Sequence, residues 1–372
     1  LADVTGHGAE ACKTQRLVGL LRAANGTEVK WLVRTFLPHM AAGISLEASV
    51  LPALGAAHLL HAAGEPGPAG SGMPAAEALR EAQEAVRQGF ALRPDVGALV
   101  RALLESGVEG VRGACTLTVG VPMQPMLAKP ATSVEELLNR IAGALPNEPP
   151  EGTLRLIAEH KYDGQRAQIH QTDSGQVRIY SRKIDDITYK YPDVVAAVRR
   201  CGPSGRAFVV DAEIVAVVPA QNGAGGAAAA ASPTAGGDAM GIAAFQSLST
   251  RKRKNVTEAG AADASVAVKL FLFDLLLLGE APLLRRPLAE RREALRRMFT
   301  EERDVLAFGE AATVDVSLGQ APTEDAAARE RLTQAMQRSL ADGCEGLMVK
   351  RLDAPYEPST KRSDCWLKLK KD

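Results

Sequence analysis

The stretch IAEHKYDGQRAQIH, residues 157–170, places a lysine, an aspartate, a glycine and an arginine after a half-apolar strand pattern. A strand is expected up to Lys161, and Asp163 and Gly164 are typical of a turn. A lysine at a strand end is most often a solvated cation. It acts as a nucleophile only where neighbouring cations or desolvation lower its pKa from the ordinary value of about 10.4. The rest of the chain decides between these interpretations.

Further cations occur near the end of the chain, in WLKLKKD, residues 366–372. Because side chains alternate along a strand, Lys368 and Lys370 lie on one face and Leu367 and Leu369 on the other. We expect the leucines to pack inward. The two lysines would then project together into a cleft, where they favour an anionic substrate.

Carboxylates appear with the same parity inside apolar runs. Asp211 and Glu213 share a face of the predicted strand FVVDAEIVAVV, and Glu345 stands at the entrance of the next such run, CEGLMVKRL. A buried carboxylate is costly unless it is paired or holds a metal, and Mg²⁺ prefers oxygen ligands. Lys350 has the opposite parity to Glu345, so both face one cleft only if a bulge or twist intervenes.

The composition bounds the class of protein. A chain of 372 residues with 46% hydrophobic and 24% charged residues is long enough for two compact globular domains. The formal net charge of zero gives no global attraction to a polyanion, so any phosphate binding must come from local basic patches. The five scattered cysteines indicate free thiols in a reducing compartment. No apolar run approaches the roughly 18 residues of a membrane span.

The pattern along the chain changes from helical to strand-rich. Helices are expected at residues 27–37, 45–63, 75–92 and 95–106, followed by a proline-punctuated linker at 117–130. Strands are expected at residues 154–160, 167–170, 176–182, 207–218, 266–278, 346–352 and 366–371, and helices at 287–299 and 324–340. The six arginines of residues 285–297 are expected on a solvated helix face. Residues 219–240 form a low-complexity insertion.

Ordered motifs give these patterns a family. KYDG (161–164), YSRK (180–183), DAEIVA (211–216), FQSLSTRKRK (245–254), the run 271–295 and the run 344–372 resemble, in this order, the covalent nucleotidyltransferase superfamily. Within it, the chain is most similar to eukaryotic ATP-dependent DNA ligases of the DNA ligase I type. The motifs extend over about 210 residues, whereas a lone K-x-D-G would be weak evidence.

The resemblance implies an α+β fold. Residues 1–115 would be part of a helical DNA-binding domain, and residues 116–372 a nucleotidyltransferase (adenylation) domain with ATP-grasp-like antiparallel sheets and helices. In this family an OB-fold domain normally follows. The chain ends at Asp372, so we expect that domain to be absent and nick sealing by this stretch alone to be poor.

The resemblance also implies roles for single residues. Lys161 would attack the α-phosphate of ATP, Glu159 would face the adenine amino group, and Phe273 would stack on the adenine. Glu213 and Glu345 would serve Mg²⁺ and the ribose. The remaining nucleotide contacts would come from basic residues, namely Arg166, Arg182, Lys350, Arg362, Lys368 and Lys370. The basic run Arg251, Lys252, Arg253 and Lys254 would bind DNA phosphates, although a solvated loop or a nuclear-import patch would have the same composition.

The implied activity uses ATP and Mg²⁺ to form lysyl-AMP, pass AMP to the 5′-phosphate of nicked double-stranded DNA, and seal the strand by attack of the 3′-hydroxyl. DNA repair, replication and recombination, a monomer, a possible sliding-clamp partner and a nuclear or organellar location come from the resemblance alone. Two alternatives stay open. One is a truncated, non-catalytic module that binds nicks, and the other is an RNA capping guanylyltransferase, which would prefer GTP and leave the helical part unexplained.

Overall fold

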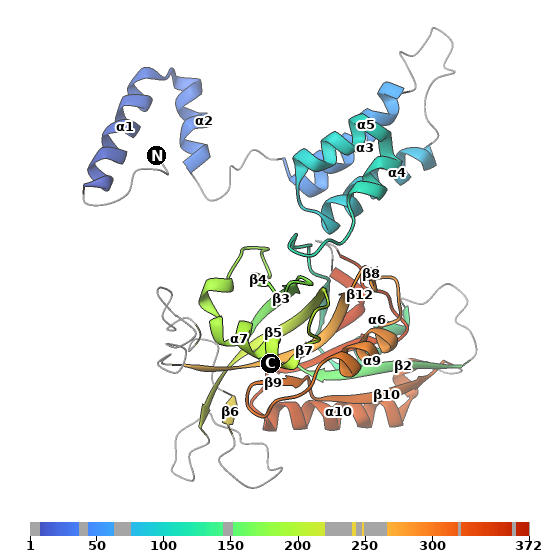
Figure 1. The fold of residues 1–372 in the computed structure, drawn as a ribbon. Coiled ribbons are helices and arrows are strands. Elements are labelled where there is room, and N and C mark those ends of the chain that lie inside the picture. The colour runs from blue at the N-terminus through green and yellow to red at the C-terminus, as the bar shows by residue number, and fades with distance from the viewer. Residues whose placement is uncertain are drawn as a thin grey trace. The chain divides into compact units, whose positions relative to one another are not determined.

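A computed structural model describes residues 8–36, 44–62, 76–143, 152–219, 240–242, 248, 266–318, 321–358 and 362–371. The chain divides into two compact units, Leu1–Gln83 and Glu84–Asp372 (Figure 1). Helices fill the described residues up to Ala114, and strands begin at Leu127. This is the mixed α+β organisation that the sequence predicts.

The N-terminal helices from α2 onward follow the expected ranges closely, whereas α1 was not predicted. They are α1 (Ala9–Ala23), α2 (Gly26–Phe36), the π-helical turn η1 (Leu46–Val50), α3 (Leu51–Ala62), α4 (Ala76–Leu92) and α5 (Val96–Ala114). The Ser45 hydroxyl accepts a hydrogen bond from the Ala48 amide at 3.2 Å, which caps η1 as predicted. Within α5, Ser106 and Gly107 leave helical geometry, so the predicted end at Ser106 is a kink and helical structure resumes beyond it.

One sheet carries the strand that leads into Lys161. Its strands lie in the order β1 (Leu127–Ala131), β12 (Arg362–Lys370), β11 (Gly346–Arg351), β2 (Thr153–His160) and β10 (Ala311–Ser317). β2 pairs antiparallel with both β10 and β11, and β11 pairs antiparallel with β12. The segment that leads into Lys161 and the strand that carries Lys368 and Lys370 are far apart in sequence. These pairings bring them together in one sheet.

The second sheet carries the predicted carboxylates and the aromatic strand. Its main path runs through β4 (Val177–Ser181), β3 (Gln165–Gln171), β5 (Phe208–Pro219), β7 (Ala267–Leu278) and β8 (Ala281–Pro282). β6 (Met240–Ile242) pairs with β5, and β9 (Leu306–Phe308) pairs with β7. The β5–β7 register shifts between Asp211 and Ala212, beside the carboxylate pair.

Helices cover both sheets and complete the cores. α6 (Val134–Gly143) and α10 (Ala326–Ala341) pack leucines and alanines against the first sheet. α7 (Pro192–Cys201) packs valines and Cys201 against the second sheet, and α9 (Leu288–Met298) packs Leu295 there. Short 3₁₀ turns, η2 (Thr188–Lys190) and η4 (Pro322–Glu324), complete the described elements. Since apolar burial drives this packing, the sheets are fixed scaffolds for the side chains between them.

The linker that precedes β1 is fixed on the second sheet. Met123 and Met126 are fully buried. The Met123 amide donates to the Gln168 side chain at 3.0 Å, and the Tyr180 hydroxyl donates to the Gly120 carbonyl at 2.6 Å. The proline-rich pattern correctly predicts an extended path, but residues 127–130 of the predicted linker form strand β1, because they pair with β12 in the first sheet.

Some expectations are wrong and others lie outside the described residues. The six arginines of residues 285–297 do not share a solvated face, because Arg291 and Arg292 are buried beneath α9. Arg251–Lys254 and most of the insertion lie outside the described residues. The five cysteines carry free thiols, as predicted. Among the described helices, none has the length and apolar character needed to cross a membrane.

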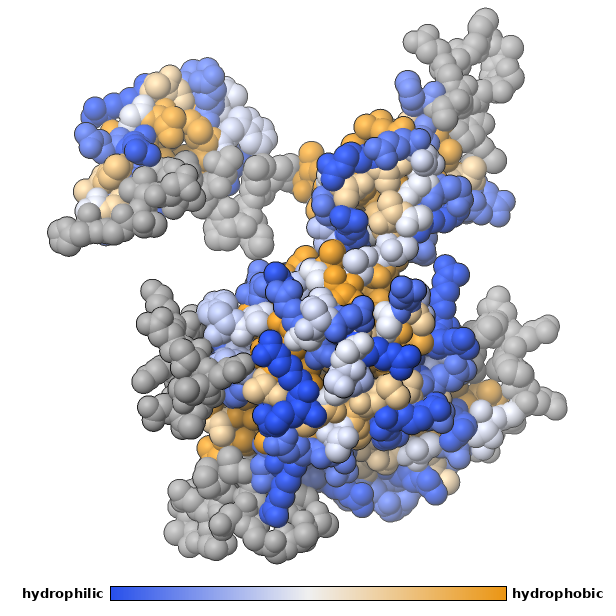
Figure 2. All heavy atoms as spheres, in the orientation of Figure 1, coloured by the Kyte–Doolittle hydropathy of each residue, from blue (hydrophilic) through white to orange (hydrophobic). Residues whose placement is uncertain are grey.

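On the face of the molecule drawn in Figure 2, hydrophilic side chains dominate the surface of the sheet-bearing unit. Among the large hydrophobic side chains, Trp31 and Val33 of α2 are exposed.

Candidate nucleotide-binding site

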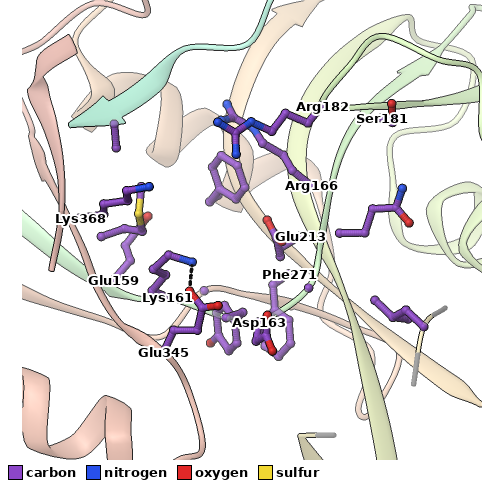
Figure 3. A pocket seen from close by; sticks show the side chains of 18 of the residues that line it. Glu159, Lys161, Asp163, Arg166, Ser181, Arg182, Glu213, Phe271, Glu345 and Lys368 are labelled. Carbon is purple, nitrogen blue, oxygen red and sulfur yellow. Dashed lines mark ion pairs between the residues drawn. The ribbon is translucent and has the colours of Figure 1, made fainter. Parts of the chain in front are cut away.

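A cavity of about 980 Å³ is lined by residues of both sheets (Figure 3). A cavity of this size is within the range of small-molecule sites. The lining includes almost all of the nucleotide-binding residues that the sequence predicts: Glu159, Lys161, Arg166, Arg182, Glu213, Phe273, Glu345, Lys350, Lys368 and Lys370. Side chains from strands distant in sequence therefore face a single space.

Lys161 lies directly after β2, at the end of its strand. Its amide donates to the Gly346 carbonyl at 2.8 Å, and its carbonyl accepts from the Glu345 amide at 2.9 Å. These bonds fix the backbone, while the ammonium group pairs with the Glu345 carboxylate (Figure 3). The side chain is 19% exposed, so the amine is accessible from the cavity.

Gly164 is required because the turn passes against β5. A Cβ atom there would lie 2.5 Å from the Ile214 carbonyl oxygen and 2.9 Å from Cγ of Glu213. Real Cβ atoms essentially never come so close to backbone oxygen. The glycine of K-x-D-G thus allows the lysine-bearing turn and the carboxylate-bearing strand to approach one another.

Glu345 and Lys350 both line the cavity despite their opposite strand parity. Gly346 separates them with a φ of +143°, a conformation that side-chain-bearing residues rarely adopt, and a Cβ there would collide with the Leu369 carbonyl. Regular alternation therefore starts after Glu345. The twist that the sequence requires is located at this glycine.

The Glu345 carboxylate joins two of the predicted cations. It pairs with Lys161 and, at 2.8 Å, with Lys370. Burial alone would raise the pKa of Glu345, but its hydrogen bonds with Lys161 and Lys370 lower it to about 2. At neutral pH this group is a fixed negative charge between two lysines.

Lys368 and Lys370 project as the period-two pattern predicts. Leu367 and Leu369 are buried in the first sheet, whereas both lysines line the cavity. Burial lowers the pKa of Lys368, and the charges of Arg362, Lys161 and Lys370 lower it further. A side chain destabilised by neighbouring cations in this way is suited to an anionic ligand.

Glu213 lines the cavity from β5, next to Gly164. Burial raises its pKa to about 7, although the charges of Arg166 and Lys161 oppose the shift. A carboxylate held this close to neutrality is typical of functional sites, because a bound cation would favour its ionised form.

Arg166 lines the cavity, but its guanidinium group is hydrogen-bonded to other residues of the protein. Its guanidinium donates to Asp211 at 2.8 Å and to the Met126 carbonyl at 2.7 Å. The Tyr356 hydroxyl, 3.2 Å from Arg166, donates to Asp211 at 2.6 Å. Asp211, which shares the predicted face with Glu213, therefore anchors Arg166 and does not line the cavity.

The aromatic side chains of the cavity exceed those that the sequence singles out. Phe273 lies beside Trp366 in an edge-to-face contact at 6.4 Å between ring centroids. Phe271, two residues earlier on the same face of β7, stacks on Tyr162 at 3.9 Å. Sequence reasoning passed over Phe271, Tyr162 and Trp366, although the period of two from Phe273 identifies Phe271.

The remaining predicted residues lie at the edges of the site or beyond the described part. Arg182 is exposed and lines the cavity from the segment after β4. Arg362 is exposed at the start of β12 and is not among the lining residues. Lys183, Lys190 and Met348 line the cavity without having been predicted. Among the described residues, no group of three or more His, Cys, Asp or Glu side chains is arranged to hold a metal.

Comparison with known proteins identifies the family to which this chain is related. The family described as "ATP dependent DNA ligase domain" matches residues 125–226 and 237–370, which contain every cavity-lining residue. DNA ligase 1 of Arabidopsis thaliana is 35% identical over 375 residues, covering 100% of this chain and 41% of that protein. DNA ligase 1 of Schizosaccharomyces pombe is 33% identical, covering 100% of this chain and 43% of that protein.

Among solved structures, mycobacterial DNA ligase D complexed with ATP and MES is similar with a TM-score of 0.42 and 24% identity, covering 66% of this chain and 59% of that one. The chain thus spans about two fifths of the length of the curated relatives above. The family match covers more than half of the chain and includes the whole cavity. The chain therefore belongs to the ATP-dependent DNA ligase family.

Proposed function

We propose that this chain is the adenylation core of a DNA ligase and that Lys161 is its nucleophile. Lys161 releases a proton to solvent, and its uncharged amine attacks the α-phosphorus of ATP. A P–N bond forms, the bond to the bridging oxygen breaks, pyrophosphate leaves, and the nitrogen gives a second proton to solvent. AMP then passes to the 5′-phosphate of a nick, and the 3′-hydroxyl displaces it. The observation that carries the proposal is the placement of Lys161 in one cavity with Glu345, Lys368 and Lys370.

The other cavity residues supply positioning and charge. Lys368 and Lys370 would neutralise phosphate oxygens, which is the main requirement of phosphoryl transfer. Arg166 and Arg182 would contribute ribose or phosphate contacts, and Arg362, which does not line the cavity, would neutralise phosphates from the start of β12. Glu159 would accept from the adenine amino group, and Phe273 would supply an aromatic face.

Mg²⁺ fits this site as an ion held largely by the nucleotide. Glu213 and Glu345 are two carboxylates lining one cavity, and substrate phosphates and water would complete the oxygen ligands that Mg²⁺ prefers. When bound, the ion would supply charge neutralisation at the phosphates. The raised pKa of Glu213 supports this assignment, because a nearby cation removes the cost of its ionisation.

We also propose the domain and partner assignments that the family suggests. Residues 1–115 would form part of a helical DNA-binding domain and residues 116–372 the adenylation domain. The basic residues 251–254 would contact the phosphates of nicked duplex DNA. Replication, repair and recombination, a nuclear or organellar location, a sliding-clamp partner and a monomeric state remain proposals by relationship.

Incubation of the chain with α-labelled ATP and Mg²⁺, followed by denaturing electrophoresis, tests the function. We expect covalent label that is released by acid and resists alkali, because a P–N bond has that stability. Lys161→Ala should lose all label. Lys371→Ala is the matched control, since Lys371 is exposed beyond the cavity and should leave labelling unchanged.

Two results would count against the proposal. One is an unlabelled wild-type chain, and the other is equal labelling of wild type and Lys161→Ala. A parallel reaction with α-labelled GTP separates the ligase from a guanylyltransferase. We expect ATP to be used far more efficiently.

A further inference from the structure

Three charged side chains form a buried group at the wall of the cavity. The Glu159 carboxylate pairs through one oxygen with Arg292 and through the other with Lys350. Glu159 is 4% exposed, Lys350 2% and Arg292 3%. Charged groups are rarely buried to this degree unless they are paired.

The three residues come from separate elements. Glu159 is on β2, Lys350 on β11 and Arg292 on α9. β2 and β11 are neighbours in the first sheet, where Met348 pairs with Glu159, whereas α9 packs on the second sheet. Only Glu159 and Lys350 line the cavity, so Arg292 holds the carboxylate from behind.

The second positive charge of the group lies close to two aromatic rings, although burial lowers the pKa of Lys350. The Lys350 ammonium lies 4.4 Å from the ring centroid of Phe273 and 4.3 Å from that of Trp366, within the range of cation–π attraction. Arg292 donates to the Phe273 carbonyl at 3.2 Å as well as to Glu159. Arg292 therefore fixes both Glu159 and the strand that carries Phe273.

The carboxylate is held in its ionised form. Burial raises the pKa of Glu159, but Lys350, Arg292 and the more distant Arg296 lower it more, so the net shift is downward. An ionised carboxylate only accepts hydrogen bonds. It can accept from the 6-amino group of a purine, and it repels the 6-oxo group, which is itself an acceptor.

We propose that Arg292 is a positioning residue whose contacts with Glu159 and the Phe273 carbonyl make the cavity select 6-aminopurine over 6-oxopurine nucleotides. The proposal rests on the proposed function in taking the ligand of this cavity to be a purine nucleotide. Arg292 touches no substrate in it. It sets the charge and orientation of the group that does.

The loss of Arg292 should relax this selection and leave the fold intact. The group carries two positive charges and one negative charge, so Arg292→Met leaves a neutral Glu159–Lys350 pair rather than an unpaired buried charge. One carboxylate oxygen then lacks its partner. The protonated form becomes more accessible and can donate to a 6-oxo group.

Nucleotide binding measured by calorimetry tests the proposal without any covalent step. ATP and ITP, which differ in the 6-substituent, are titrated without metal into the Lys161→Ala chain with and without a change at Arg292. We expect the Lys161→Ala chain that retains Arg292 to bind ATP at least about tenfold more tightly than ITP, because a mismatched buried hydrogen bond has a cost of this size. Arg292→Met should reduce the preference to roughly threefold or less, mainly by strengthening ITP binding.

Two variants sharpen the test. Arg297→Met lies on the same helix with an exposed side chain paired to Glu293, and it should leave the preference unchanged. Arg292→Lys keeps the charge but lacks the planar fork that reaches two acceptors, so its preference should be intermediate. A purely structural role would weaken ATP and ITP equally in every Arg292 variant.

The proposal would be overturned if Arg292→Met left the ratio of ATP affinity to ITP affinity unchanged. It would also be overturned if the chain that retains Arg292 bound the two nucleotides equally or bound neither. If Arg292→Met does not fold, the ratio of Arg292→Lys decides. Failure of the proposed function has a different signature, because absence of covalent label in the wild-type chain leaves the binding ratio measurable.

Discussion

Glu213 is a cavity carboxylate whose ionisation is opposed by the fold. Its side chain lies against the Gly164 turn, and burial raises the pKa of its carboxyl group to about 7 from an ordinary value of 4.5. The native state thus holds this proton more tightly than the unfolded chain does. Its contribution to stability is fully present below pH 4.5 and is lost as the pH rises through 7.

Replacement of Glu213 by Gln should flatten this pH dependence. The shift corresponds to a loss on the order of 3 kcal/mol in wild type between pH 4.5 and pH 7. In metal-free urea unfolding at pH 5, 6, 7 and 8, Glu213→Gln should therefore gain stability relative to wild type as the pH rises. Glu280→Gln, at an exposed position, is the control and should follow wild type throughout. A wild-type-to-Gln difference that stays constant across this range would contradict the assignment.

At the scale of single residues, the local sequence predicts the face of a strand to which a side chain points better than it predicts which residue that side chain contacts. The alternation in WLKLKK places Lys368 and Lys370 correctly, because strand geometry depends only on neighbouring residues. The same rule sends Glu345 and Lys350 to opposite faces, and Gly346 overrides it through a φ that only the tertiary fold requires. That Arg166 binds Asp211 depends on a pairing between distant strands, which periodicity cannot indicate.

At the scale of the element, α9 has a second buried ion pair besides that of Arg292 with Glu159. Arg291 donates to both oxygens of Asp274, at 2.8 and 2.9 Å, and to the Ala354 carbonyl at 3.2 Å. Both Arg291 and Asp274 are fully buried. The pair joins α9 to β7 and to the segment after β11, next to the helix turn that presents Arg292.

Removal of one member of this pair should be costly. Arg291→Met leaves the Asp274 carboxylate buried without its partner, and we expect a loss of about 3–5 kcal/mol in the free energy of unfolding. Urea denaturation at pH 7 measures it. Arg297→Gln, which breaks only an exposed pair on the same helix, should cost less than about 0.5 kcal/mol.

A double change tests the cause. Arg291→Met combined with Asp274→Leu removes both charges and should recover much of the loss. Equal destabilisation by the single and double variants would instead mean that α9 depends on the shape of the arginine side chain.

The elements themselves were predictable where their patterns were strong. Strands β2, β5, β7 and β11 and helices α4 and α10 lie within a few residues of expectation, because each has a clear apolar period. β10 was missed, since its alternation in AATVDVS is short and carries few large apolar residues. The prediction that the arginines of α9 lie on a solvated face was wrong for Arg291 and Arg292, because composition does not show which positive charges have buried acidic partners.

In the compact unit Glu84–Asp372, which contains both sheets, one hydroxyl group connects four segments. The Tyr356 hydroxyl accepts from the Met126 amide at 3.0 Å, donates to Asp211 on β5 at 2.6 Å and lies 3.2 Å from Arg166 on β3. The linker before β1, two strands of the second sheet and the segment leading to β12 therefore meet at one point beneath the cavity. Burial and the charge of Asp211 raise the pKa of Tyr356, so this hydroxyl stays protonated and able to donate.

Deletion of that hydroxyl should loosen the whole unit rather than one strand. Tyr356→Phe keeps the ring but removes one of the two donors, Tyr356 and Arg166, to the same oxygen of the buried Asp211 and leaves the Met126 amide without its acceptor, and we expect a loss of about 1–3 kcal/mol. The denaturant midpoint in urea at pH 7 measures this loss, with the slope of the transition unchanged if unfolding stays cooperative. Tyr189→Phe, at a ring that is 58% exposed, should stay within about 0.5 kcal/mol of wild type. A midpoint for Tyr356→Phe equal to that of Tyr189→Phe would mean that Arg166 alone holds Asp211 and the linker in place.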